Sequence, residues 1–339
     1  MLSRTITLLL GATFALASFD ARAATLDDVK GRGVLKCGVA PNNPGFSLAD
    51  STGKIQGFDA DFCYGLAAAI FGDKDKGQPT NATPRDAFTM LTTGAVDILT
   101  HRFTETFGRD NGSGVEFVLV STYDGQGFIV RKDLKITSAK QLNGAQICVA
   151  EGTTTEINIA DYFKSIGASY KIVTFDSIDS AKVGYDEGRC DAWSNDRASL
   201  ASHTIALKDP NAHVILPEVI SNEPIGPWVR QGDQAWAHTA RWVFYGLIAA
   251  EESGITQANV EDMVKDSKDP AVQRLLGVSE DLGSKIGLPR DWAVKMIKAV
   301  GNYGEIYDRN LGSKSPFHLP RGPNALKKDG GMIYSPAFR

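Results

Sequence analysis

The sequence predicts an α/β protein that is built as two lobes. Strand-like apolar segments alternate with helix-like segments from residue 34 onward, which is the pattern of a parallel sheet flanked by helices. A second alternation of the same kind begins at residue 146. The chain has 339 residues, which is more than one ordinary hydrophobic core accommodates. Together these observations favour two sheets, each with its own core.

The N-terminus predicts an export signal over residues 1–23. Arg4 is positive, residues 6–19 are mostly apolar, and Ala21-Arg22-Ala23 fits a small-x-small cleavage site. The apolar run is shorter than the ~20 residues that a membrane-spanning helix needs. We therefore expect an exported protein whose mature chain begins near Ala24.

Composition excludes several classes of function. Charged residues make up 22% of the chain, hydrophobic residues 42%, and the formal net charge is −4, which predicts a soluble globular protein. Without a basic block the chain is a poor candidate for binding nucleic acid. No metal-ligand set, phosphate loop or Ser/Cys nucleophile motif is present, so we expect no cofactor and no metal.

The four cysteines predict disulfides, because an exported chain meets an oxidising compartment. Three pairings are possible. We favour Cys37 with Cys63 and Cys148 with Cys190, since each pair then lies within one predicted lobe. Each bridge would stabilise the fold by roughly 3 to 4 kcal/mol.

The first alternation ends in a polar segment. A strand over 34–39 leads to a loop over 40–46, where Asn42 and Asn43 offer free amides. Helices are predicted over 60–71 and 85–93, and a buried strand begins at Val96. In sheets of this kind, ligands bind where loops follow the strands. Further strands are expected over 115–123 and 127–131.

The polar segment that follows Val96 reads Thr100-His101-Arg102-Phe103-Thr104-Glu105-Thr106 and then reaches Arg109. Arg109 is a candidate anchor for a carboxylate, because a guanidinium presents two parallel donors. The alternative is a surface pair with Asp110 or Glu116.

The second alternation supplies two further candidates. Thr153 and Thr154 precede a helix over 157–165 and suit an anion, although Thr153-x-x-Glu156 also fits a capping box. Asp196 ends a strand and can accept from an ammonium group, or it can cap the helix over 197–207. The remaining predicted strands are 146–150, 170–175, 190–196, 214–220 and 225–229.

The second alternation also includes a helix over 177–187. The C-terminal part is predicted to be largely helical, with helices over 234–253, 257–265, 270–275 and 290–308. The tail over 312–339 is rich in glycine and proline and should lie extended over the first lobe. Aromatic residues at helical spacing are expected in the core: Trp236, Trp242, Trp292, Phe244, Tyr303 and Tyr307.

The order of these parts resembles the periplasmic solute-binding proteins of ATP-driven (ABC) amino acid importers, in particular the general L-amino acid-binding branch. The motifs that carry the resemblance span the mature chain: Leu35-Lys36-Cys37-Gly38-Val39, Gly57-Phe58-Asp59-Ala60-Asp61-Phe62-Cys63, Tyr123-Asp124-Gly125-Gln126-Gly127-Phe128, Gly152-Thr153-Thr154-Thr155-Glu156, Gly188-Arg189-Cys190-Asp191, Gln257-Ala258-Asn259-Val260, Asp291-Trp292-Ala293-Val294 and Gly301-Asn302-Tyr303-Gly304-Glu305.

This resemblance implies a type II periplasmic-binding-protein fold, in which two hinge strands join the lobes and the ligand binds in the interlobe cleft. One lobe would comprise 24–128 and 226–339, and the other 129–225. Arg109 falls on the family's carboxylate-binding arginine, Asp196 on its ammonium-binding aspartate, and Thr153 and Thr154 on its helix-start donors. The expected partner is a membrane permease, and a monomer is expected.

The segment before Arg109 departs from the branch, whose pattern is like S-R-N-T-T-W-T. Thr104 keeps the pattern's character. Inward-facing His101 and Arg102 would favour an acidic or amide side chain, whereas an inward-facing Glu105 would favour a basic one. We expect a polar, acidic or amide L-amino acid. Two alternatives remain: a dehydratase-like enzyme that uses His101 and Glu105 as base and acid, and a ligand-sensing protein that acts on a membrane receptor.

Overall fold

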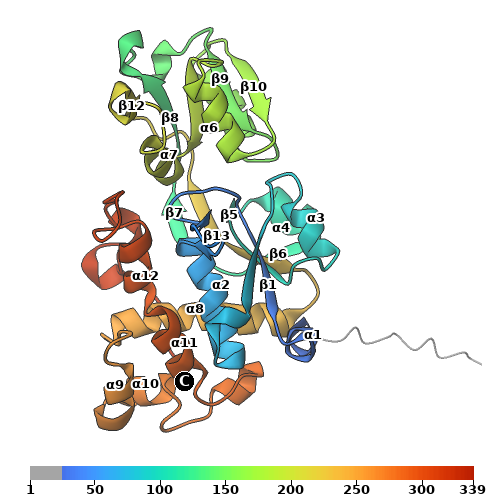
Figure 1. Cartoon of the computed structure of the whole chain (residues 1–339), viewed down its shortest axis with the longest axis vertical. Coiled ribbons are helices and arrows are strands. Elements are labelled where there is room, and N and C mark those ends of the chain that lie inside the picture. The colour runs from blue at the N-terminus through green and yellow to red at the C-terminus, as the bar shows by residue number, and fades with distance from the viewer. Residues whose placement is uncertain (1–24) are drawn as a thin grey trace, which may run out of the picture.

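The computed structural model describes residues 25–339, which fold into two α/β lobes (Figure 1). The predicted export signal and its cleavage site lie outside this range. Among the described helices, none is long and apolar enough to cross a membrane.

The first lobe is organised around a six-stranded mixed sheet. Its strand order is β4-β1-β5-β13-β6, and β7 also pairs with β13. β1 runs parallel to β4 and β5, whereas β13 runs antiparallel to β5, β6 and β7. The strands are β1 (Leu35–Val39), β4 (Gly77–Asn81), β5 (Ile98–Thr104), β6 (Val115–Phe117), β7 (Thr122–Asp124) and β13 (Glu223–Arg230). A small separate hairpin consists of β2 (Leu48–Ala49) and β3 (Ile55–Gln56).

The second lobe contains a five-stranded sheet with the order β10-β9-β11-β8-β12. β9 runs parallel to β10 and β11, and β8 runs antiparallel to β11 and β12. Buried clusters that include Phe163 and Trp193 give this lobe its own core. The strands are β8 (Gln126–Arg131), β9 (Gln146–Ala150), β10 (Lys171–Phe175), β11 (Ala192–Asp196) and β12 (His213–Ile215).

Two neighbouring segments carry the chain between the sheets (Figure 1). β7 ends at Asp124 in the first sheet, and β8 begins at Gln126 in the second. The chain returns at Glu223, which pairs with Asp124 in the β7–β13 register. A side chain at Gly226 would not fit, because its Cβ would lie 1.8 Å from the carbonyl oxygen of Leu119. The close approach of β13 to the segment between β6 and β7 therefore depends on glycine at this position.

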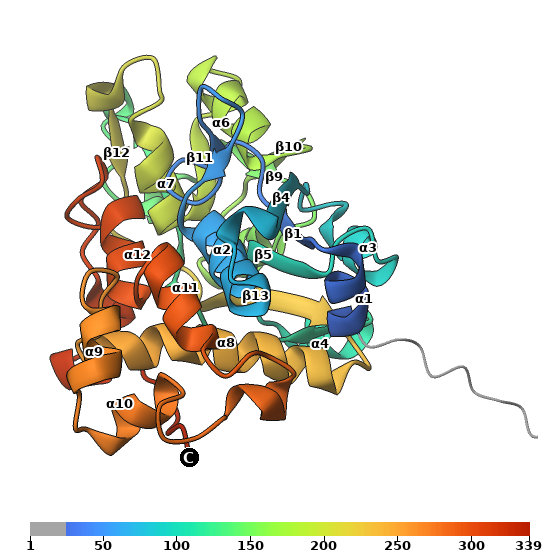
Figure 2. The same ribbon diagram turned by 60° about the horizontal axis from the view of Figure 1, so that its bottom comes forward.

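Helices cover both sheets, and the C-terminal helices gather beneath the first lobe (Figure 2). α2 is buried along most of its length among the aromatic residues of the first core. The helices are α1 (Thr25–Arg32), α2 (Phe58–Phe71), α3 (Ala87–Thr92), α4 (Phe107–Gly112), α5 (Thr155–Ser165), α6 (Ile178–Asp186), α7 (Arg197–Thr204), α8 (Gln234–Glu252), α9 (Val260–Asp266), α10 (Pro270–Leu275), α11 (Trp292–Val300) and α12 (Tyr303–Asn310).

The predicted disulfides are confirmed. Cys37 on β1 is bonded to Cys63 on α2, and Cys148 on β9 is bonded to Cys190 just before β11. Each bridge therefore joins a strand to a neighbouring element of the same lobe.

Some predicted elements have different limits. The predicted helix over 290–308 is two helices, because Gly301 adopts φ 76° and ψ −170° and Asn302 starts α12 with a capping box. The predicted strand over 115–123 is divided into β6 and β7, and α1 was not predicted. Trp242 is only half-buried, and its ring centre lies 5.0 Å from that of Phe338 in the tail. The other predicted core aromatics are buried.

Candidate functional site

A small pocket lies between the lobes, where β5 and β11 end and α5 begins. Its free volume is about 20 Å³, which is room for about one water molecule. Both lobes contribute side chains, so the pocket is closed by the meeting of the lobes. It is lined by Pro84, His101, Arg102, Phe103, Thr104, Arg109, Thr153, Thr154, Thr155, Ile178, Asn195, Asp196 and Ser199.

Most of the predicted ligand-binding residues meet in this pocket, and the two loop residues do not. Asn42 has a φ of 49° and is exposed. Asn43 is fully buried, with its Oδ1 3.5 Å from the hydroxyl of Ser199 on the second lobe. The residues that the structure brings together are Arg109, Asp196, Thr153, Thr154, Thr104, His101 and Arg102.

Arg109 is held in place by the segment that ends β5 and starts α4. The Thr106 hydroxyl caps α4 by accepting from the amide of Arg109 at 3.2 Å. The Nη1 of Arg109 donates to the carbonyl oxygen of Thr104 at 2.9 Å. Its guanidinium carbon lies 5.1 Å from the ring centre of Phe103. These contacts leave guanidinium N–H groups for a carboxylate.

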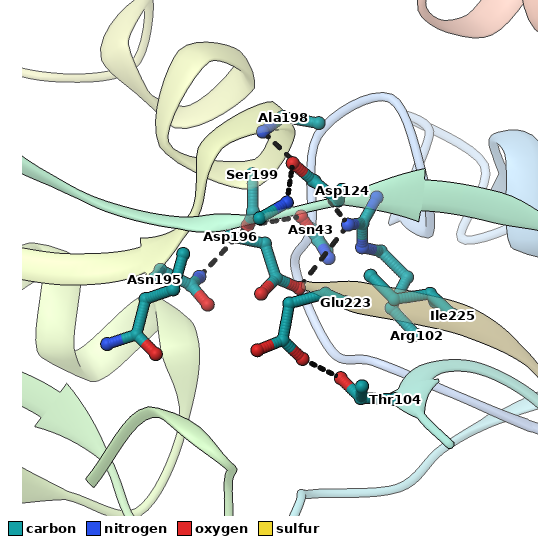
Figure 3. Close-up of polar contacts among 12 residues, drawn as sticks. Asn43, Arg102, Thr104, Asp124, Asn195, Asp196, Ala198, Ser199, Glu223 and Ile225 are labelled. Atoms are coloured by element: carbon teal, nitrogen blue, oxygen red, sulfur yellow. Dashed lines mark hydrogen bonds and ion pairs between the residues drawn. The ribbon is translucent and has the colours of Figure 1, made fainter. Parts of the chain in front are cut away.

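Arg102 joins the lobes at the pocket (Figure 3). Its Nη2 donates to the carboxylate of Asp124 at 2.8 Å and to that of Asp196 at 3.3 Å. Its guanidinium carbon lies 4.0 Å from the ring centre of Phe46, so the buried cation has contacts on its face as well as on its edge. Burial opposes its charge, but Asp124, Asp196 and Asp59 raise the pKa of Arg102. Its positive charge is therefore engaged within the protein.

Asp196 is a buried carboxylate whose pKa lies near neutral pH. Burial raises the pKa of Asp196 to about 7, although Arg102 opposes this shift. The charges of Asp124 and Glu223 add to the increase. A positive group placed beside Asp196 would favour its ionised form. Its chemistry therefore suits a ligand's ammonium group.

The sequence left open that Arg109, Asp196 and Thr153 have only structural roles, as a surface ion pair or as helix caps. These contacts do not form within residues 25–339. Arg109 makes no ion pair with Asp110 or Glu116, and Glu116 pairs with another arginine. Asp196 occupies the N-cap position of α7, but its side chain makes no capping hydrogen bond. The Thr153-x-x-Glu156 capping box is also not formed, because Thr153 donates to the carbonyl oxygen of Ala150 at 2.8 Å.

Glu223 is an acceptor at the second crossing between the sheets that the sequence analysis missed. Its carboxylate accepts from the hydroxyl of Thr104 in the first lobe and from the amide of Asn158 in the second, the latter at 2.8 Å. The Thr154 hydroxyl donates to it at 3.3 Å. The signal in the sequence was that Glu223 is a carboxylate directly before Pro224 and the apolar strand that returns to the first lobe. Its position beside the first crossing could not be deduced from that signal.

Polar atoms with no hydrogen-bond partner gather near the pocket, whereas buried polar groups in proteins are usually paired. Asp59, which the sequence analysis also missed as a site residue, is buried, and burial raises its pKa well above the ordinary value. Within the described chain, the unpartnered atoms of this region are Asn43 Nδ2, Asp59 Oδ2, Thr100 Oγ1, both ring nitrogens of His101 and His203 Nε2.

The acid–base pair of the enzyme alternative is not assembled. His101 lines the pocket, whereas Glu105 is exposed and does not line it. Four residues along an extended chain span about 13 Å, which separates the two side chains. Burial lowers the pKa of His101 to about 3, whereas an effective general base has a pKa near the working pH. No cluster of three or more His, Cys, Asp or Glu in the described part of the chain could hold a metal ion.

Comparisons with known proteins cover nearly the whole chain. The family described as "Bacterial extracellular solute-binding proteins, family 3" matches residues 35–313. The General L-amino acid-binding periplasmic protein AapJ of Rhizobium johnstonii is 47% identical over 330 residues, which cover 97% of this chain and 96% of the relative. The Glutamate/glutamine/aspartate/asparagine-binding protein BztA of Rhodobacter capsulatus is 46% identical over 325 residues, 96% of each chain.

A solved structure gives the same likeness in three dimensions. It is described as an ABC transporter periplasmic binding protein from Brucella ovis with glutathione bound. Its TM-score is 0.91 at 48% sequence identity, and the match covers 94% of this chain and 100% of that chain.

Proposed function

We propose a function for this chain from the fact that it belongs to the bacterial extracellular solute-binding proteins, family 3. The protein captures an L-amino acid between its lobes in the periplasm. It then delivers the amino acid to the membrane permease of an ABC importer. The predicted type II periplasmic-binding-protein fold is confirmed by the likeness to the Brucella ovis protein.

The observation that carries this proposal is the position of Arg109 and Asp196. They come from different lobes and line the same small pocket. A guanidinium can bind the carboxylate of an amino acid through parallel hydrogen bonds, and a carboxylate can accept from its ammonium group. An amino acid that bridges these two residues would therefore hold the lobes together.

Binding requires the lobes to move apart and close again, since a free volume of about 20 Å³ is too small for an amino acid. The two crossings between the sheets are the natural hinge, and hinge closure around ligands is common in two-lobed binding proteins. We place the lobe boundaries at these crossings, within a few residues of the predicted division into 24–128 with 226–339 and 129–225.

The ligand is proposed to have a polar, acidic or amide side chain. The names of the two curated relatives point to this range. The pocket supports a polar side chain through Thr154, Asn195 and His101, which bring hydroxyl, amide and imidazole groups to its wall.

A longer ligand with an amino acid at one end is a second candidate. A cavity of about 720 Å³ lies on the side of the hinge strands next to the tail, and its lining shares Arg102 with the pocket. Glutathione carries a free amino acid group at one end, and the Brucella ovis protein is described with glutathione bound. This candidate predicts that glutathione competes with amino acids for one site.

We propose that the protein is not an enzyme and acts as a monomer. The separation of His101 from Glu105 supports this proposal, because the enzyme alternative needs both side chains at one site. A role in sensing would use the same ligand-bound form, so it depends on the membrane partner and not on the pocket.

Calorimetry of the mature protein against the common L-amino acids and glutathione tests the proposal. We expect one-to-one binding of at least one polar amino acid, together with compaction in solution scattering. If no α-amino acid and no glutathione binds while another small acid does, the proposed function is wrong. Uptake of the bound amino acid by cells that lack the protein should fall relative to cells that contain it.

A further inference from the structure

His101 is a buried imidazole in the wall of the pocket. It is 2% exposed, and its ring is stacked on that of Phe103, with 4.1 Å between ring centres and 14° between the planes. Neither ring nitrogen has a hydrogen-bond partner within residues 25–339. The carbonyl groups of Arg102 and Ala82 favour the charged ring, but neither meets hydrogen-bond geometry. The stack therefore fixes the ring while its polar atoms stay available.

The surroundings of His101 keep the imidazole neutral. Burial is the largest cause of its lowered pKa, and the nearby positive charges of Arg109 and Arg102 lower it further. A neutral imidazole has one N–H donor and one nitrogen acceptor. A group that both donates and accepts hydrogen bonds is therefore its natural complement.

We propose, on the basis of the function proposed above, that His101 reads the ligand's side chain and selects an uncharged side chain that donates and accepts hydrogen bonds, a carboxamide or a hydroxyl. A hydrocarbon side chain would leave the ring nitrogens of His101 without a hydrogen-bond partner in the closed pocket. Such a site rejects analogues that lack the polar group more strongly than it rejects changes in size.

The inference narrows the range proposed above, because an acidic side chain is disfavoured for a separate reason. His101 brings no positive charge, and Arg102 is engaged by Asp124 and Asp196. If Arg109 binds the ligand's α-carboxylate, no positive charge of the pocket lining remains for a second carboxylate. Glu223, buried close by, would repel it. The neutral amide of the same shape avoids this cost, which is larger in a buried site than in water.

The test compares ligands of matched shape by calorimetry at pH 8. For the wild-type protein we expect L-glutamine to bind at least tenfold more tightly than L-glutamate and L-methionine, or L-asparagine to exceed L-aspartate and L-leucine by the same factor. In His101→Phe, which keeps the stack on Phe103, the amide should lose about tenfold or more while L-alanine changes less than twofold. His101→Gln, which keeps a donor and an acceptor, should recover part of the amide affinity.

His238→Phe is the matched control, because His238 is exposed on α8 and does not line the pocket. Imidazole ¹⁵N chemical shifts give an independent readout. The His101 shifts should keep the values of a neutral ring from pH 5.5 to 8, and they should change when the amide binds. Tighter binding of the acid than of its amide by the wild-type protein would overturn the inference. Equal losses for all ligands in His101→Phe, or no loss for any, would also overturn it. Should His101→Phe not fold, His101→Gln and the ¹⁵N shifts decide. Failure of every amino acid to bind would instead refute the proposed function.

Discussion

The carboxylate of Asp124 caps the helix that Asp196 begins. The Asp124 Oδ2 accepts from the amide of Ala198 in the first turn of α7 at 3.2 Å, while Asp196 occupies the N-cap position without capping (Figure 3). Asp124 comes from the hinge and Asp196 from the end of β11. Asp124 therefore satisfies a backbone N–H group in the first turn of α7, and Asp196 is left to face Arg102 and the pocket.

Replacing Arg109 tests the anchor for the ligand's carboxylate. In Arg109→Ala we expect the affinity for an amino acid to fall by at least a hundredfold, because a buried carboxylate loses its charged donors, at a cost of several kcal/mol. Calorimetry measures the loss. Arg189→Ala is the control, since Arg189 is exposed on the second lobe away from the pocket. Normal binding by Arg109→Ala would show that the carboxylate binds elsewhere.

The raised pKa of Asp196, about 7 against ~3.9 for an unfolded chain, predicts coupled proton release. Because the folded value is the higher one, the stability that this group contributes is present below about pH 4 and is lost as the pH rises to about 7. An ammonium ligand favours the ionised carboxylate, so binding below pH 7 must expel the proton.

We therefore expect affinity to fall by up to tenfold per pH unit below about 7. Calorimetry in two buffers of different ionisation enthalpy should detect the release of nearly one proton at pH 6 and of almost none at pH 8.5. An affinity that is constant from pH 5.5 to 8.5, with no proton release, would contradict this assignment.

Arg102 should matter for stability because it is the buried cation among several carboxylates. Arg102→Met leaves Asp124 and Asp196 without their partner and should lower the free energy of unfolding by about 3 to 5 kcal/mol. Urea unfolding measures the change. Arg85 also pairs across the lobes, with Glu151 at 3.1 Å, but its side chain is 72% exposed. Arg85→Met should therefore cost less than about 1 kcal/mol. Equal losses of unfolding free energy in the two variants would mean that the buried Arg102 network stabilises the protein no more than the exposed Arg85 pair does.

The sequence was informative wherever a function depends on a local pattern. Strand–helix alternation predicts that Thr104 and Asp196 follow the ends of strands, and both reach the same pocket. The disulfides followed from the exported address and from lobe membership. These features depend on periodicity and on which lobe a residue belongs to, which neighbouring residues in the sequence can reveal.

Features that depend on distant partners were not accessible. Thr104 and Glu223 are hydrogen-bonded across 119 positions of the chain, and no local pattern indicates that partnership. The side chain of Asn42 was expected in the pocket, but the direction of a loop side chain depends on a backbone turn that the composition does not specify. His101 was expected to supply positive charge, and only its burial reveals that it is neutral.

The tail is tied to the hinge by Asn324, which leads to the last prediction. The Asn324 Oδ1 accepts from the backbone amide of Tyr123 at 2.6 Å, and its Nδ2 donates to the Tyr123 carbonyl oxygen at 3.0 Å. The side chain thus acts as a strand partner for β7, next to the first crossing. α12 makes a separate contact with the same region, because the Tyr303 hydroxyl donates to the carbonyl oxygen of Ser121 at 2.8 Å.

Asn324→Ala should therefore loosen the hinge as well as the fold. We expect a loss of about 1 to 3 kcal/mol in unfolding free energy, since buried backbone groups lose their partner. The ligand-free protein should have a larger radius of gyration in solution scattering, and its ligand affinity should fall in proportion to the reduced closed population. Asn222→Ala is the control, because Asn222 lies beside the second crossing but is exposed. If Asn324→Ala lowers stability without changing the radius of gyration or the affinity, the tail supports the fold and has no influence on the hinge.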